Sequence, residues 1–162
     1  MPALFVETEP PSPTPLRFSI DPQPLLALLS FGIAEPYGTQ HPLTELIRRF
    51  KTGHGIDVGP LLTFYDRDTE DAEDVAKLAA AWQSAAALGE CVGAMRRALR
   101  EDNETAGFAS VEPTLPQLLE ELEAMAAGAG TGRIQISFSL TWGDRPGEGG
   151  EPAAADAENP AG

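Results

Sequence analysis

The stretch RIQISFSLTW, residues 133–142, alternates apolar and polar side chains over its whole length. Its apolar members are Ile134, Ile136, Phe138, Leu140 and Trp142. A period of two is typical of a β-strand that turns one face to a core and the other to water. This segment is the strongest strand signal in the chain, so it predicts that the fold contains a sheet.

Shorter segments upstream predict further strands. LRFSI at 16–20 alternates in the same way, and GPLLTFYD at 59–66 is a short run rich in apolar and aromatic residues. Both patterns fit strands that are bounded by turn residues. The stretch ALFVE at 3–7 is a possible additional strand at the edge of the sheet.

Helical periods occupy the intervals between these strands. Helices are expected after Asp21 and His41, and Thr114 opens a further helix that ends at Gly128. Thr114 stands three residues before Gln117, which is the spacing of a capping box. The sequence therefore predicts an α+β fold: a small, mostly antiparallel sheet of three or four strands, packed by helices on one face, with one long central helix.

The predicted central helix covers residues 69–102. Acidic residues occupy its first turns and arginines its last turns, as the helix dipole favours. Its apolar residues recur at spacings of three and four, and little of its surface is polar. A straight helix of this length would span about 50 Å, whereas a compact domain of this size measures about 35 Å across.

Two outcomes would resolve this mismatch in length. The helix kinks, with Gly89 or Gly93 as the expected positions, or one end projects and is covered by another chain. The second outcome predicts a partner interface on the helix, because small residues there would let a neighbouring backbone come close. The residues of this predicted interface are Trp82, Ala85, Gly89, Val92 and Met95.

Charge and cysteine content narrow the classes of function. The chain has 162 residues, with 25 acidic against 11 basic side chains and a formal charge of −14. Such a surface repels phosphate backbones and anionic lipids, so no nucleic-acid or membrane partner is expected. A single cysteine, Cys91, allows no internal disulfide. We expect a soluble, cytoplasmic protein.

Composition also sets the expected domain boundaries. Residues 1–15 contain the motif TEPPSPTP and form a proline-rich lead, and residues 16–142 form a single α+β domain. Residues 143–162 lack aromatic and branched aliphatic side chains and are rich in acids. Such a segment buries too little apolar surface to offset its ordering entropy, so it is predicted to be a disordered acidic tail.

The stretch KTGHGIDVGP, residues 51–60, is the part of the sequence that most resembles a binding loop. Its three glycines do not have dinucleotide-binding spacing, and they follow a helix instead of preceding one. Gly53 is the expected end of that helix. His54 and Cys91 stand at no spacing that is typical of zinc ligands, so neither a metal nor a cofactor is predicted.

Two functions from different classes fit these observations. The leading hypothesis is a non-catalytic protein-interaction module, such as an accessory subunit, adaptor or inhibitor, that binds another copy or another protein. The alternative is a small ligand-binding or enzymatic domain with a pocket near His54, Tyr65, Asp66 and Cys91. A nucleic-acid-mimicking inhibitor is a third possibility and would require acidic residues in rows over one face.

Overall fold

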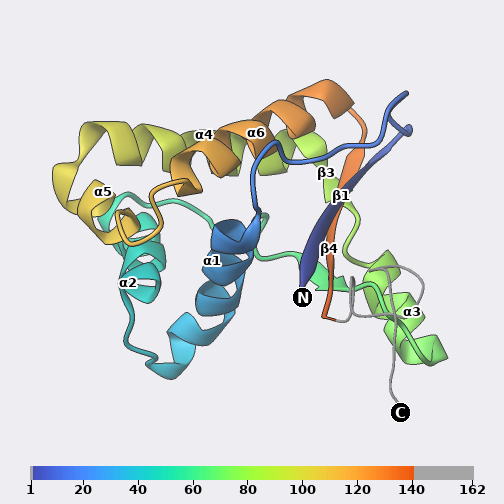
Figure 1. The fold of residues 1–162 in the computed structure, drawn as a ribbon, viewed down its shortest axis with the longest axis horizontal. Coiled ribbons are helices and arrows are strands. Elements are labelled where there is room, and N and C mark those ends of the chain that lie inside the picture. The colour runs from blue at the N-terminus through green and yellow to red at the C-terminus, as the bar shows by residue number, and fades with distance from the viewer. Residues whose placement is uncertain (1, 141–162) are drawn as a thin grey trace, which may run out of the picture.

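The structure, a computed structural model, describes residues 2–140. Four strands and six α-helices make up this part of the chain (Figure 1). The strands are β1 (Ala3–Glu9), β2 (Phe64–Asp66), β3 (Gln83–Ser84) and β4 (Arg133–Ser139). The α-helices are α1 (Gln23–Ala34), α2 (Pro42–Arg48), α3 (Ala72–Ala79), α4 (Ala85–Glu101), α5 (Asn103–Ala109) and α6 (Leu115–Ala129). A 3₁₀ turn, η1 (Glu35–Tyr37), follows α1, and a π-helical turn, η2 (Arg49–Gly53), extends α2.

The sheet is built around β4, with which each of the other strands pairs. β1 runs antiparallel to β4 along its whole length, while β2 runs parallel and β3 antiparallel on the opposite side of β4. The sheet is therefore mixed, and the prediction of a mostly antiparallel sheet is corrected. β1 confirms the possible edge strand at 3–7 and extends it to Glu9, so the sheet includes part of the predicted lead at 1–15.

Helices cover both faces of this sheet. In Figure 1, α1, α4 and α6 gather on one side of it and α3 lies on the other. The first side holds the core, which includes Ile134 and Ile136 of β4. On the second side, the Gln135 amide donates to Leu78 O of α3 at 2.7 Å, and Ser137 is buried. The predictions of helices on one face and of a strand with one wet face are therefore wrong.

The predicted long helix at 69–102 is two helices. α3 ends at Ala79, and the chain turns into β3, where Gln83 pairs with Ile134 of β4. Ser84 then caps α4, because its hydroxyl accepts the Ala87 N–H at 3.1 Å. α4 has 17 residues and spans about 25 Å, so it fits inside the domain. The excess length that suggested a covering partner is absent.

The predicted strand at 16–20 is a loop that keeps the expected pattern of facing side chains. Leu16, Phe18 and Ile20 pack against the core, while Ser19 N–H donates to Glu121 Oε1 of α6 at 2.9 Å. The backbone is thus held by a helix side chain and not by a neighbouring strand. No helix among residues 2–140 has the length and apolarity that crossing a bilayer requires. The predicted disordered tail, like Trp142, lies outside the described residues.

Candidate functional site

His54 lies in the turn that ends the helical segment of α2 and η2. Its N–H donates to Arg49 O at 3.0 Å. η2 ends at Gly53 as predicted, but the residue with left-handed backbone is Gly55, whose φ is 65°. Glycine reaches that region without steric cost. The stretch at 51–60 therefore stops a helix, and its turn places His54 against α5.

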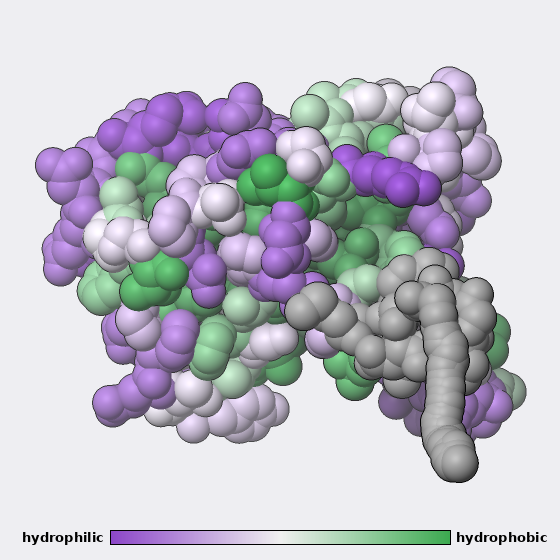
Figure 2. All heavy atoms as spheres, in the orientation of Figure 1, coloured by the Kyte–Doolittle hydropathy of each residue, from purple (hydrophilic) through white to green (hydrophobic). Residues whose placement is uncertain are grey.

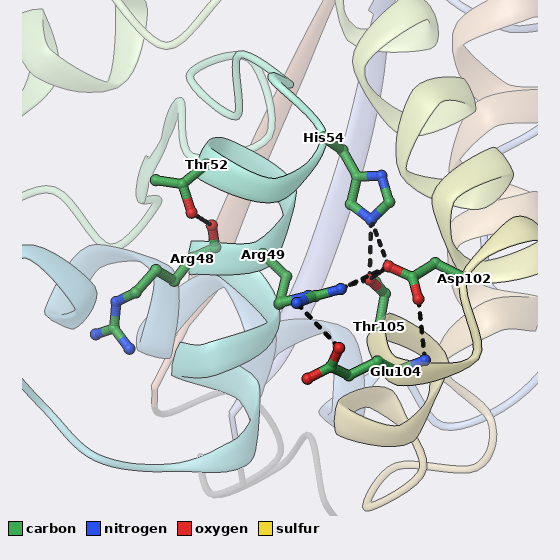
Figure 3. Close-up of polar contacts among 7 residues, drawn as sticks. All are labelled: Arg48, Arg49, Thr52, His54, Asp102, Glu104 and Thr105. Carbon is green, nitrogen blue, oxygen red and sulfur yellow. Dashed lines mark hydrogen bonds and ion pairs between the residues drawn. The ribbon is translucent and has the colours of Figure 1, made fainter.

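Five side chains meet where η2 contacts the junction of α4 and α5 (Figure 3). They are Arg49, His54, Asp102, Glu104 and Thr105. His54 Nε2 lies 2.9 Å from Thr105 Oγ1 and 3.2 Å from Asp102 Oδ2. Arg49 Nη2 donates to Asp102 Oδ2 at 2.6 Å, and its Nη1 lies 3.3 Å from Glu104 Oε1. We call this group the His54 cluster.

Asp102 is the centre of the His54 cluster. Its Oδ2 accepts the Thr105 hydroxyl at 2.8 Å, and its Oδ1 accepts the Glu104 N–H at 3.1 Å, which caps α5. Hydrogen bonds from Thr105 and from Arg49 favour the ionised carboxylate and lower the pKa of Asp102 to about 2. This carboxylate is therefore a fixed negative charge at neutral pH.

The His54 cluster differs from a catalytic triad in the way its protons are arranged. A triad imidazole takes the proton of the nucleophile with one nitrogen and bonds the acid with the other. Here the same nitrogen of His54 approaches both partners, and the Thr105 hydroxyl donates directly to Asp102. Thr105 is also fully buried, so a substrate could not reach its oxygen. The geometry suits a structural role, in which these hydrogen bonds and ion pairs hold η2 against the α4–α5 junction.

Cys91 shares a hollow with His54, but its thiol is poorly suited to chemistry. Both residues line a hollow of about 370 Å³ between the turn at 54–60 and α4. Cys91 is 6% exposed, and burial raises the pKa of its thiol to about 11. Because the thiolate is the reactive form, this cysteine is largely inert at neutral pH.

The other two residues predicted for this pocket lie elsewhere. Tyr65 and Asp66 are on β2, and neither lines the hollow that holds His54 and Cys91. The Tyr65 hydroxyl donates to Asp74 Oδ1 of α3 at 3.0 Å, and this bond is the main cause of a raised pKa for Tyr65. Asp66 Oδ1 accepts the Asp68 N–H at 2.8 Å. Within residues 2–140, no three His, Cys, Asp or Glu side chains are arranged to hold a metal ion.

The residues predicted for a partner interface lie mostly inside the protein. Ala85, Val92 and Met95 have no exposed surface. A Cβ placed on Gly89 would lie 3.7 Å from the Ala126 Cβ of α6, so the neighbour that the small residues admit belongs to the same chain. Trp82 is half-buried, with its ring centroid 5.6 Å from the Arg133 guanidinium carbon. This face of α4 is an internal packing surface.

The outer edge of β1 is not among the sites that the sequence predicts. Arg67 N–H donates to Phe138 O at 2.8 Å, so the main chain of Phe138 points toward β2. Main-chain groups alternate sides along a strand, and the odd-numbered residues of β4 therefore bond to their partners on β1. Hence Leu4, Val6 and Thr8 direct their N–H and C=O groups away from β4. These groups have no hydrogen-bond partner within residues 2–140. We call them the open edge of β1.

The chain after β1 folds back beside this open edge without pairing to it. Pro10, Pro11, Pro13 and Pro15 have no N–H to donate, so this segment cannot complete a ladder. Between it and β1 lie two hollows of about 580 Å³ and 400 Å³, and the larger is lined mainly by apolar side chains such as Leu16. Figure 2 shows a recess with apolar atoms where Figure 1 places β1.

Comparison with known proteins leaves these features to be interpreted on physical grounds. No protein-family model matches the chain. Neither a curated protein nor a solved structure shows significant similarity to it.

Proposed function

We propose that this protein is a non-catalytic protein-interaction module, an accessory subunit, adaptor or inhibitor of a cytoplasmic complex. It binds its partner through the open edge of β1. The observation that carries this proposal is that the main-chain groups of Leu4, Val6 and Thr8 have no partner within the described chain, although these residues are at most 9% exposed. Strand addition by a partner would supply the missing hydrogen bonds.

The energetics of buried polar groups support this assignment. More than nine in ten buried main-chain N–H and C=O groups in proteins are hydrogen-bonded. Leaving one unpaired costs about 1–3 kcal/mol, so water or another chain must meet these groups. The two hollows along β1 give such a chain access to the edge.

The alternative, a small enzyme or ligand-binding domain, rests on a single observation. His54 and Cys91 line the same hollow of about 370 Å³. The raised pKa of the Cys91 thiol and the hydrogen bonds that hold His54 against α5 both favour a structural role for these residues. We therefore place the function at the sheet edge.

The test compares the variants Thr8→Pro and Thr8→Val as baits for affinity purification from native extract. Both lose the hydrogen bond from the Thr8 hydroxyl to Pro10 O, but only the proline removes the outward N–H. Because that N–H is not part of the ladder with β4, Thr8→Pro should fold, which circular dichroism verifies. We expect a defined protein to co-purify with the wild type and with Thr8→Val, and to be lost with Thr8→Pro. Absence of any partner from the wild-type sample would refute the proposed function.

A further inference from the structure

A strand added to the open edge of β1 would meet two different environments. Its side chains would point alternately to the two faces of the sheet. On the core face, Leu16 and Phe18 are partly buried and line the larger hollow, together with Leu4. These neighbours favour apolar side chains at every second position of the added strand.

The opposite face of the added strand would lie next to acidic side chains. Glu7 and Glu9 point to this face, because Leu4, Val6 and Thr8 point to the core. The side chains of both glutamates are 52% exposed. Glu7 Oε2 lies 3.7 Å from Arg67 Nη2, a long and partly solvated pair that contributes little. Glu9 is already paired, since its Oε1 accepts from Arg133 Nε at 2.6 Å and lies 2.5 Å from Arg133 Nη2. A second cation on this face would therefore bind Glu7.

Net charge decides between a second copy of this chain and a different partner. The formal charge of −14 means that two copies repel each other as they approach, whereas a basic segment is attracted. An extended segment with alternating apolar and basic side chains fits all three observations. Its apolar side chains would pack on the core face, its basic side chains would lie on the face that carries the glutamates, and its positive charge would be attracted by the net negative charge of the protein.

Building on the proposed function, we propose that the open edge of β1 binds an extended segment of another protein in which apolar and basic side chains alternate. The proline-rich segment at 10–15 lies beside the open edge of β1 but does not pair with it. The outward main-chain groups of β1 can therefore bond to the incoming strand. The added strand becomes a new edge of the sheet, next to β1.

The test uses the full chain labelled with ¹⁵N and the capped octapeptide KVKLKVKT. Titration followed by amide hydrogen exchange should show that the peptide slows exchange at Leu4, Val6 and Thr8 by about tenfold or more, as strand pairing protects main-chain amides. Exchange at Phe5 and Glu7, which already pair with β4, should change much less. The affinity should fall as salt is added, because the attraction is partly electrostatic.

Two control peptides separate the elements of the proposal. EVELEVET keeps the alternation and reverses the charge, and KKKKVVLT keeps the charge and loses the alternation. Each should bind at least about tenfold more weakly than KVKLKVKT. The Thr8→Pro variant should bind KVKLKVKT more weakly than Thr8→Val does. Equal binding of all three peptides, or of both variants, would overturn the proposal.

Two further outcomes distinguish this proposal from the proposed function. If KVKLKVKT does not bind but a partner from extract still requires the Thr8 N–H, the proposed segment chemistry is wrong and the interaction function stands. If light scattering shows that the wild type is a dimer and that the Thr8→Pro variant is a monomer, a second copy occupies the open edge of β1 and the proposal is overturned. If no peptide binds and no partner is captured by the wild type, both proposals fail.

Discussion

Gly132 stands where the end of β1 and the start of β4 come closest, and replacing it with alanine should destabilise the sheet. A Cβ at this position would lie 2.1 Å from Glu9 O and 3.1 Å from Ala129 O. Both neighbours are main-chain atoms, so no side chain can rotate away. The backbone must open by at least about 1.3 Å, because an ordinary contact begins at about 3.4 Å.

The cost of this movement can be estimated from what it displaces. Glu9 and Arg133 form the last pair of the β1–β4 ladder, and Ala85 N–H donates to Gly132 O at 3.1 Å at the start of α4. Overpacking of this kind costs about 1–3 kcal/mol of the free energy of unfolding.

Gly128→Ala is the matched control. Gly128 lies in the last turn of α6, one residue before its end, and a Cβ there would meet no heavy atom within 4 Å. This variant should match the wild type or gain at most about 1 kcal/mol, because alanine loses less backbone entropy than glycine in a helix. Urea denaturation followed by circular dichroism measures both values. Gly132→Ala variants within about 0.5 kcal/mol of wild type would refute the close approach at Gly132.

Three other predictions follow from the same structure. The amides of the open edge of β1 should exchange with solvent faster than those of Phe5 and Glu7, although their side chains are more deeply buried; native-state hydrogen exchange measures this, and uniform protection along β1 would contradict the strand pairing. Alkylation of Cys91 by iodoacetamide in the native state should be at least about a hundredfold slower than in urea, because a pKa near 11 in place of 9.0 lowers the thiolate fraction; similar rates would place the thiol at the surface. Asp102 should stabilise the fold fully above its ordinary pKa of 3.8, and this contribution should be lost as the pH falls toward its folded pKa of about 2. Acid unfolding of Asp102→Asn should lack that component, and identical pH profiles would show that Arg49 and Thr105 do not hold the carboxylate.

Side-chain periodicity predicted the positions of β4 and β1 better than it predicted the partners of these strands or the burial of the second face of β4. The alternation at 133–142 and the apolar run at 3–7 correspond to β4 and β1. The direction of β2 depends on the four α-helices that the chain forms between β2 and β4, and no local pattern encodes that crossover. The alternation at 16–20 correctly predicted which side chains face the core. The backbone of this segment is held by a hydrogen bond to Glu121 of α6 and not by a neighbouring strand.

Helix boundaries were hard to predict because the sequence contains more residues that can cap a helix than the structure uses as caps. Thr114 and Ser84 can both cap a helix. Ser84 does so and divides the predicted helix at 69–102, whereas the Thr114 side chain makes no capping bond. Gln117, which should complete the capping box, donates to Glu121 instead. The pairing of β3 with β4 places Ser84 directly before α4, where its hydroxyl caps that helix.

The candidate site could not be read from spacing, because its members are distant in the chain. His54 and Thr105 are 51 residues apart, and only the packing of η2 against α5 brings them together. Composition alone predicts a stiff lead from the prolines at 10–15. They gain another meaning once β1 is known to be an edge, since they show why the strand remains unpaired there.

The position of β4 in the chain has a consequence for biosynthesis. Within residues 2–140, β1, β2 and β3 each pair only with β4, and β4 follows all of them in sequence. While the ribosome is still making α6, none of these strands has its partner. β1 remains unpaired while more than a hundred further residues are translated. Helical contacts must therefore hold the nascent chain together, and the sheet closes in one late step when residues 133–139 emerge.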